Sequence, residues 1–276
     1  MKQIFLSRKG ITVEEVPEPL IDTGMMVVKN LYSCISPGTE VAGIRSIKKN
    51  LIKKIYEKPN VIKNVFSVFN KQGISDTKKI IKKKLGQFYE IGYSSVGIVE
   101  QVDKNIKSFS SGDFVACAGG GFASHAEKIL VPEKLAVKVK NSKKIESYSS
   151  VAMGAISLQG VRRLQPNLGD RCLVIGLGFI GQITLQLLKA NGVNVFGVDP
   201  SKIALEKAKK QSFLNVYESI NDLLIDMPQD LKDIGFDGVI VTASSQSNKI
   251  LNDSFFMCRR KAKVVIVGDV GLGFDR

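Results

Sequence analysis

The stretch that decides the fold is Leu173-Val174-Ile175-Gly176-Leu177-Gly178-Phe179-Ile180-Gly181. Its three apolar residues predict a buried strand, and a Gly-x-Gly-x-x-Gly pattern follows directly. A helix is predicted over 179–190 and a second strand over Val193–Val198, which Asp199 follows. Strand, glycine-rich turn, helix and strand form the context in which this pattern predicts dinucleotide binding.

Each position of the motif has a physical role in holding a pyrophosphate. Gly176 permits a tight turn, Gly178 lets the backbone approach the phosphates, and Gly181 allows the helix to pack closely on the strand. The first helical turn, with Phe179 and Ile180, offers amide donors and a partial positive charge. We expect these five residues to contact the cofactor.

The residues after the motif indicate which dinucleotide is bound. Asp199 ends the second predicted strand, where a carboxylate accepts hydrogen bonds from the ribose hydroxyls of NAD and repels the 2′-phosphate of NADP. Lys202 would soften this discrimination, and Thr242 is expected among the cofactor contacts. The prediction is therefore NAD, with NADP as one alternative and a unit that binds no dinucleotide as another.

The chain around the motif divides into two halves of different character. Beyond the motif, a helix is predicted over 201–211 and strands near 213–216, 237–242 and 263–268, an alternation typical of a parallel sheet with helices on both faces. The first half is β-rich, and a helix over 146–164 leads out of it. The predicted fold class is α/β, with a β-rich domain over 1–150 and a doubly wound domain over 151–276. The predicted strands of the first half are 11–16, 25–32, 95–102, 113–118 and 126–131.

The net charge of +14 is concentrated in one segment. Between Arg45 and Lys84 there are thirteen basic residues and two acidic ones, with apolar residues near helical spacing between them, so residues 45–88 are predicted to form a lysine-rich helical insertion. A solvated surface is one interpretation of this charge, and a patch that attracts an anionic substrate or an acidic partner is another. A nucleic-acid partner is not expected, because 32 of the forty basic residues are Lys and they are unevenly spread.

Other sequence features limit the chemistry and the compartment. The four cysteines, Cys34, Cys117, Cys172 and Cys258, form no Cys-x-x-Cys pair, and His125 is the only histidine. This pattern favours neither a disulfide framework nor a structural zinc site. No apolar run is long enough for a membrane span, and the first residues lack the pattern of a signal peptide. We therefore expect a cytoplasmic protein.

The chain resembles the medium-chain dehydrogenase/reductase superfamily of alcohol dehydrogenase-like proteins. The resemblance implies a GroES-like catalytic domain followed by a Rossmann domain, which suits the order of the two halves. Besides the glycine motif, the matching stretches are Ile35-Ser36-Pro37-Gly38-Thr39-Glu40, residues 92–99, Ser111-Gly112-Asp113-Phe114-Val115, and Ala126-Glu127 before the strand that ends at Val131.

A narrower resemblance is to the N-terminal half of bi-domain oxidoreductases. Residues 33–40, the lysine-rich insertion and residues 154–163 carry it. It implies an association with surface-polysaccharide or sugar metabolism, and a partner that is a fused or associated second oxidoreductase domain. Relatives also continue through a sixth Rossmann strand, whereas this chain stops at Arg276, so a C-terminally truncated or incomplete Rossmann domain is expected.

The resemblance fails at the positions where zinc-dependent relatives bind their metal. The first ligand position falls at Ser36 or Pro37, the Gly-His-Glu position reads Gly92-Tyr93-Ser94, and residues 151–160 contain no cysteine. Thiolate and neutral imidazole are the ligands that zinc prefers. Cys34 beside Glu40 makes a poor site alone, so catalytic zinc is not expected.

Without zinc, another group must stabilise the oxygen that gains charge during hydride transfer. Ser36 and Thr39 are candidates to relay a proton, and Tyr93 is a candidate to donate a hydrogen bond to a substrate oxygen. Each also has a structural interpretation, since Ser and Thr beside Pro-Gly commonly cap turns. His125 is expected to have a packing or surface role.

Together these features predict an NAD(P)-dependent oxidoreductase. It would transfer hydride between nicotinamide and a carbonyl/alcohol pair, or an activated double bond, of a polar and anionic substrate such as a sugar derivative. The alternative is a non-catalytic dinucleotide-binding module, or a fragment, whose basic helices dock a partner. A homo-oligomer is compatible with either hypothesis.

Overall fold

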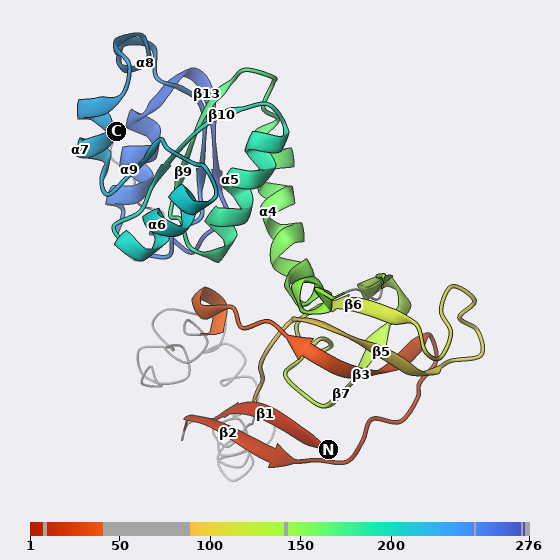
Figure 1. Ribbon diagram of the computed structural model, residues 1–276. Helices are drawn as coiled ribbons and strands as arrows, with labels where there is room; N and C mark the ends of the chain where they lie inside the picture. The colour runs from red at the N-terminus through yellow and green to blue at the C-terminus, as the bar shows by residue number, and fades with distance from the viewer. Residues whose placement is uncertain (8–9, 41–88, 141–142, 246, 272, 274–276) are drawn as a thin grey trace, which may run out of the picture. The chain divides into compact units, whose positions relative to one another are not determined.

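The computed structural model describes residues 1–7, 10–40, 89–140, 143–245, 247–271 and 273. The chain forms two compact units, Met1–Ala152 (unit 1) and Met153–Arg276 (unit 2) (Figure 1). Each unit has its own apolar core. The helical insertion expected over residues 45–88 lies outside the described residues.

Unit 2 is built on a five-stranded parallel sheet in the order β11-β10-β9-β12-β13. The first strand in sequence, β9, therefore lies in the middle, with the next strand on one side and a later one on the other. Such a reversal of strand order creates a crevice at the carboxyl end of the central strand, where ligands of doubly wound sheets bind. The strands are β9 (Arg171–Ile175), β10 (Asn194–Val198), β11 (Val216–Tyr217), β12 (Phe236–Val241) and β13 (Cys258–Ile266).

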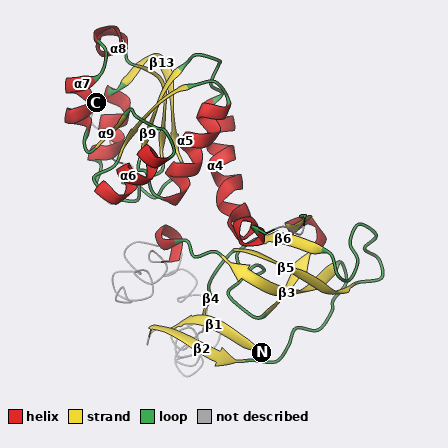
Figure 2. Cartoon of the chain, in the orientation of Figure 1, coloured by secondary structure: helices red, strands yellow, loops and turns green. Residues whose placement is uncertain are grey.

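Helices cover both faces of this sheet because β9 is apolar on both sides. Cys172 and Val174 belong to a core with α4 (Val151–Leu164), α5 (Phe179–Ala190) and α6 (Lys202–Lys210). Leu173 and Ile175 belong to a second core with α7 (Ile220–Asp226), α8 (Gln229–Ile234) and α9 (Lys249–Phe256). Figure 2 shows helices on either side of the strands of this sheet. Successive side chains of a strand point to opposite faces, so a continuous apolar run suits a doubly covered sheet. The predicted α/β class is confirmed.

The helices α7, α8 and α9 are absent from the elements that the sequence pattern predicts. The start of α7 carries a local signal, since the Ser219 hydroxyl accepts from Asp222 N (3.2 Å) and donates to the Asp222 carboxylate (2.6 Å). A Ser three residues before an acidic residue is typical of a helix N-terminus. The helices themselves have only six to eight residues, too few for a clear helical period.

Unit 1 contains two antiparallel sheets, and its core of mainly Val, Met and Ile side chains is built on the strands of the larger one. The larger sheet has the order β7-β3-β5-β6-β8, and a three-stranded sheet has the order β2-β1-β4. A run of 3-10 helix, η2 (Ile145–Ser150), leads into α4, where a single helix over 146–164 is expected. The strands are β1 (Lys2–Ser7), β2 (Gly10–Glu15), β3 (Met25–Ser33), β4 (Tyr89–Glu90), β5 (Ser94–Val102), β6 (Phe114–Ala118), β7 (Lys128–Pro132) and β8 (Ala136–Lys138).

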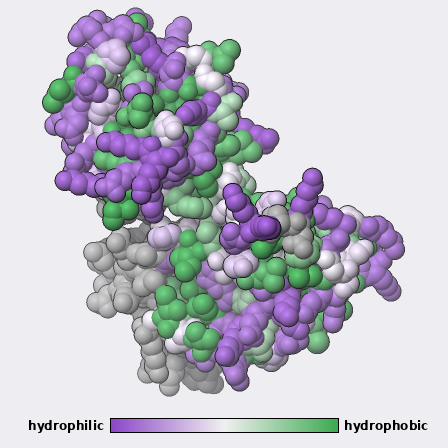
Figure 3. Space-filling view, in the orientation of Figure 1, coloured by the Kyte–Doolittle hydropathy of each residue, from purple (hydrophilic) through white to green (hydrophobic). Residues whose placement is uncertain are grey.

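Much of the visible surface of unit 2 is hydrophilic (Figure 3). At one edge of its sheet, β13 carries the exposed side chains of Arg260, Lys261 and Lys263. Among the described residues, no helix combines the length and the apolar character needed to cross a bilayer.

The glycine-rich turn after β9 brings α5 unusually close to the strand. A Cβ atom placed on Gly181 would lie 2.0 Å from the Gly176 carbonyl oxygen and 2.9 Å from the Thr242 hydroxyl. A Cβ atom on Gly178 would meet no other atom within 4 Å. Gly181 is therefore needed for packing, whereas the space beside Gly178 is open.

This contrast predicts different effects of alanine at the two glycines. Gly181→Ala forces backbone apart, so the free energy of unfolding should fall by about 2 kcal/mol or more. Gly178→Ala meets open space, and the change should stay below about 1 kcal/mol. Urea unfolding of both variants measures this difference, and equal losses would contradict the packing role of Gly181.

Candidate functional site

The ends of three neighbouring strands fix the glycine-rich turn of unit 2. Gly176 has a φ of +95°, a conformation that favours glycine, and its amide donates to Val198 O at 2.8 Å. From the other side, the Thr242 hydroxyl donates to the Gly176 carbonyl at 2.5 Å, and Thr242 N donates to Ile175 O at 2.8 Å. Thr242 thus holds the turn in place.

The first turn of α5 presents one side to solvent and the other to the core. Phe179 is exposed, whereas Ile180 is half-buried. The Ile180 carbonyl accepts hydrogen bonds from the hydroxyls of Ser157 (3.2 Å) and Thr184 (2.9 Å), which anchor this turn to neighbouring helical residues. Gly178, as the N-cap, leaves open space at the positive end of a twelve-residue helix.

Asp199 points at the same turn. Its Oδ2 accepts from Leu177 N at 2.6 Å, and its Oδ1 accepts from Ser201 N at 2.8 Å. Each carboxylate oxygen can accept more than one hydrogen bond, so both retain acceptor capacity. Lys202, the other residue expected to affect cofactor choice, is exposed at the first position of α6.

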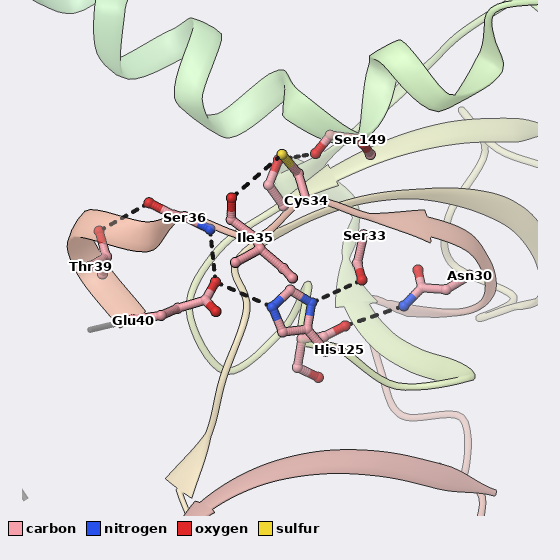
Figure 4. Close-up of polar contacts among 11 residues, drawn as sticks. Asn30, Ser33, Cys34, Ile35, Ser36, Thr39, Glu40, His125 and Ser149 are labelled. Carbon is pink, nitrogen blue, oxygen red and sulfur yellow. Dashed lines mark hydrogen bonds and ion pairs between the residues drawn. The ribbon is translucent and has the colours of Figure 1, made fainter. Parts of the chain in front are cut away.

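In unit 1, the Ser-Pro-Gly-Thr-Glu sequence forms a helical turn over residues 37–40 after β3 (Figure 4). Glu40 N donates to Ser36 O (3.0 Å), and the Glu40 carboxylate accepts from Ser36 N (2.9 Å). Pro37 follows as the first helical residue, where its missing N–H costs nothing. The Ser36 and Thr39 hydroxyls lie 3.4 Å apart, with Ser36 buried and Thr39 exposed.

His125 is buried against this turn. Its Nε2 lies 3.2 Å from Glu40 Oε1, and its Nδ1 lies 2.8 Å from the Ser33 hydroxyl (Figure 4). The His125 backbone amide donates to Ile91 O at 2.9 Å. A Cβ atom on Gly92 would lie 2.9 Å from atoms of the imidazole ring, so the ring packs directly on this glycine.

Tyr93 and Ser94, at the position where the resemblance would place a zinc-binding Gly-His-Glu motif, make structural contacts. The Ser94 hydroxyl accepts from Ala152 N (3.1 Å) and donates to Ser149 O (2.5 Å), so it caps the start of α4 from a distant strand. Tyr93 precedes β5, is half-buried, and accepts from Gly119 N through its carbonyl. Ser94 is fully buried and carries no metal-binding group suited to zinc.

Cys34 lies near the Ser36–Glu40 turn and is half-buried. Burial, with the negative charge of Glu40 as a second cause, raises the pKa of the Cys34 thiol. Within the described ranges, no group of three or more His, Cys, Asp and Glu side chains could hold a metal ion.

Local sequence patterns placed Ser36 and Thr39 together but did not predict the contact of Glu40 with His125. The two residues are 85 positions apart, so no local pattern connects them. The spacing of Ser36 and Glu40 did carry a signal, because an acidic residue shortly after a Ser-Pro pair is typical of a capped helix start.

Comparison with known families and proteins gives a match in unit 2 and broader similarity beyond it. Residues 180–273 match the family model described as zinc-binding dehydrogenase. An alcohol dehydrogenase from Geobacillus stearothermophilus is 28% identical over 207 residues, which cover 64% of this chain and 60% of that protein. A D-guloside 3-dehydrogenase from Escherichia coli is 28% identical over 116 residues, 41% of this chain and 32% of that protein. These alignments span less than two thirds of either relative's length.

Solved structures share the fold of nearly the whole chain. Galactitol-1-phosphate dehydrogenase from Escherichia coli has a TM-score of 0.75 at 17% identity, covering 100% of this chain and 78% of that chain. A putative zinc-binding dehydrogenase from Sinorhizobium meliloti, bound to NADP, has a TM-score of 0.76 at 18% identity and covers 99% and 78%. In fold the chain is therefore similar to these dehydrogenases, and its residues 180–273 resemble the zinc-binding dehydrogenase family.

Proposed function

We propose that the protein is an NAD-dependent oxidoreductase that works without catalytic zinc on a polar alcohol or carbonyl compound. The observation that carries this proposal is the Asp199 carboxylate, held against the amide of Leu177 in the glycine-rich turn. When bound, the nicotinamide would accept hydride from an alcohol carbon or donate it to a carbonyl or an activated double bond.

The residues of unit 2 fit a dinucleotide. Gly178 leaves room beside the backbone at the α5 N-terminus, where amide donors and the helix dipole favour a pyrophosphate. Phe179, Ile180 and Gly181 form the turn that follows, and Thr242 fixes Gly176 from behind. The same set of groups suits either NAD or NADP.

Asp199 favours NAD over NADP. Its two oxygens keep acceptor capacity for ribose hydroxyls, whereas a 2′-phosphate beside this carboxylate would bring like charges together. Lys202 is exposed at the next helix start and would reduce the discrimination rather than reverse it. One structural relative was solved with NADP and another with NADPH, so the two cofactors occur on this fold.

Unit 1 supplies polar groups in place of a metal. Ser36 and Thr39 form a hydroxyl pair, and Tyr93 has a phenol at the start of β5. Such donors can stabilise an oxygen that gains charge during the reaction. The family model whose description mentions zinc covers residues 180–273. The positions that the resemblance assigns to zinc ligands lie before this segment, so the match with the model adds no candidate ligand.

The substrate class follows from the relatives and from the charge of the chain. Proteins similar to it are named for alcohols, butanediol and arabinitols, which are small hydroxyl compounds. The net charge of +14 would attract an anionic substrate, such as a sugar derivative that carries an acidic group.

Replacement of Asp199 should change the cofactor preference. In Asp199→Ala, the ribose loses its acceptor, so the Kd for NADH should rise about tenfold, a loss of about 1.4 kcal/mol, while NADPH binding should hold or improve. Calorimetric titration with both cofactors measures the preference. Asp253→Ala, which removes a half-buried carboxylate paired with the exposed Lys249 on α9, is the matched control and should leave both affinities within about twofold.

The wild-type titration also separates the two hypotheses for this chain. NADH binding with turnover of hydroxyl compounds supports the oxidoreductase. Binding without turnover of any of a panel of alcohols, polyols and sugar acids supports a non-catalytic dinucleotide-binding module instead. A folded chain that binds neither cofactor would contradict both.

Metal removal should leave the protein unchanged. Purified chain is expected to contain well below one zinc per molecule by elemental analysis, and treatment with a strong zinc chelator should alter neither its Tm nor its turnover. Stoichiometric zinc whose removal abolishes activity would show that this part of the proposal is wrong.

A further inference from the structure

The only histidine of the chain, His125, connects three segments of unit 1. Its ring lies between Ser33 at the end of β3 and Glu40 in the helical turn, and it packs on Gly92 before β5. The side chains of His125 and Glu40 are only 5% and 12% exposed. A polar pair so shielded from water is costly unless its geometry is well satisfied.

The partners define which ring nitrogen carries a proton. An ionised carboxylate can only accept, so Nε2 must donate to Glu40 Oε1. In the neutral ring, Nδ1 then accepts from the Ser33 hydroxyl at 2.8 Å. Both ring nitrogens are therefore used, and the plane of the ring is fixed.

The same carboxylate oxygen that His125 contacts also holds the start of the turn. Glu40 Oε1 lies 2.9 Å from Ser36 N and 3.2 Å from His125 Nε2. Fixing this oxygen therefore fixes the amide of Ser36, the residue whose hydroxyl meets Thr39. Without His125, the Glu40 carboxylate would be free to break its hydrogen bond with Ser36 N and turn toward solvent.

We propose that His125 and Glu40 are a positioning pair, which holds the Ser36–Thr39 hydroxyls in the geometry used for the reacting oxygen of the substrate. The proposal rests on the proposed function for the role of those hydroxyls. His125 acts through Glu40 and does not itself touch the substrate. A purely packing role would need only the shape of the ring against Gly92, whereas the positioning role needs its Nε2–H donor.

Two substitutions separate the donor from the packing. His125→Gln keeps an N–H donor on a side chain of similar length, and His125→Leu keeps apolar bulk without a donor. In the full chain, hydrogen exchange at the Ser36 amide should be at least about tenfold faster in His125→Leu than in wild type, and close to wild type in His125→Gln. Exchange at Ala116, in the core strand β6, serves as the internal reference. Unchanged Ser36 exchange in folded His125→Leu would overturn the pair.

The kinetic measurement tests the consequence for catalysis. With a hydroxyl substrate identified by the panel, kcat of His125→Leu should fall about tenfold or more, because small misplacements of catalytic groups are expensive. The Kd for NADH should stay within about twofold, since the glycine-rich turn is in the other unit, and His125→Gln should recover most of kcat. Loss of NADH binding and kcat in equal measure, or no rescue by Gln, would count against positioning.

Because His125 is the only histidine, its imidazole nitrogens can be observed without ambiguity. If His125→Leu fails to fold, long-range ¹H–¹⁵N spectra of wild type and Glu40→Ala decide the question. Wild type should show the Nε2–H tautomer, and Glu40→Ala should lose that preference; identical spectra would overturn the pair. These spectra and the exchange data need no substrate, so they test the pair even if wild type neither binds NADH nor turns over a substrate. That outcome would contradict only the proposed function.

Discussion

The structure of unit 2 depends on one close contact between two segments of its backbone, at Gly176 and Gly181. The carbonyl of Gly176 and the Cα of Gly181 lie so close that no side-chain atom fits between them. This contact places the N-terminus of α5 at the carboxyl end of the central strand, where the strand order reverses. The open space at Gly178 and the position of Asp199 beside the turn both follow from this placement, because the turn can follow only one path.

In unit 1, side-chain hydrogen bonds rather than glycines fix the path of the backbone. Its Ser36–Glu40 turn is too short to be stable alone, and it is held by Glu40 and, through Glu40, by a histidine from a distant loop. Ser94 does comparable work at the start of α4, where a side chain from β5 replaces the local cap. In unit 1, polar side chains from distant segments thus fix the backbone at both of these helix starts.

Local patterns predicted the elements of unit 2 well where the signal was long or chemically specific. The helix over 179–190 matches α5, and the strands around the motif match β9 and β10 to within a residue or two, because apolar runs and glycines fix both ends. The short helices α7, α8 and α9 were missed, since a helix of two turns shows little of its 3.6-residue period.

The candidate sites also show that local sequence patterns predict contacts within a short segment but not contacts between distant segments. The glycine motif and Asp199 lie within a single βαβ unit, so spacing along the chain was enough to bring them together. The hydrogen bond between His125 and Glu40 depends on how β3 and the loop before β7 approach each other, which no pattern in either segment encodes. Roles for Ser36, Thr39 and Tyr93 stay predictions, because sequence and geometry establish their placement but not their chemistry.

The exposed edge of the unit 2 sheet has a consequence for how copies of the chain meet. An edge strand offers unpaired backbone groups to any other strand, and identical edges are the most abundant partners in a concentrated solution. Arg260, Lys261 and Lys263 place positive charges along β13, so the β13 strands of two copies carry charge of the same sign. Like charges on two such strands repel each other before their backbones can pair, and this repulsion weakens as salt screens the charges.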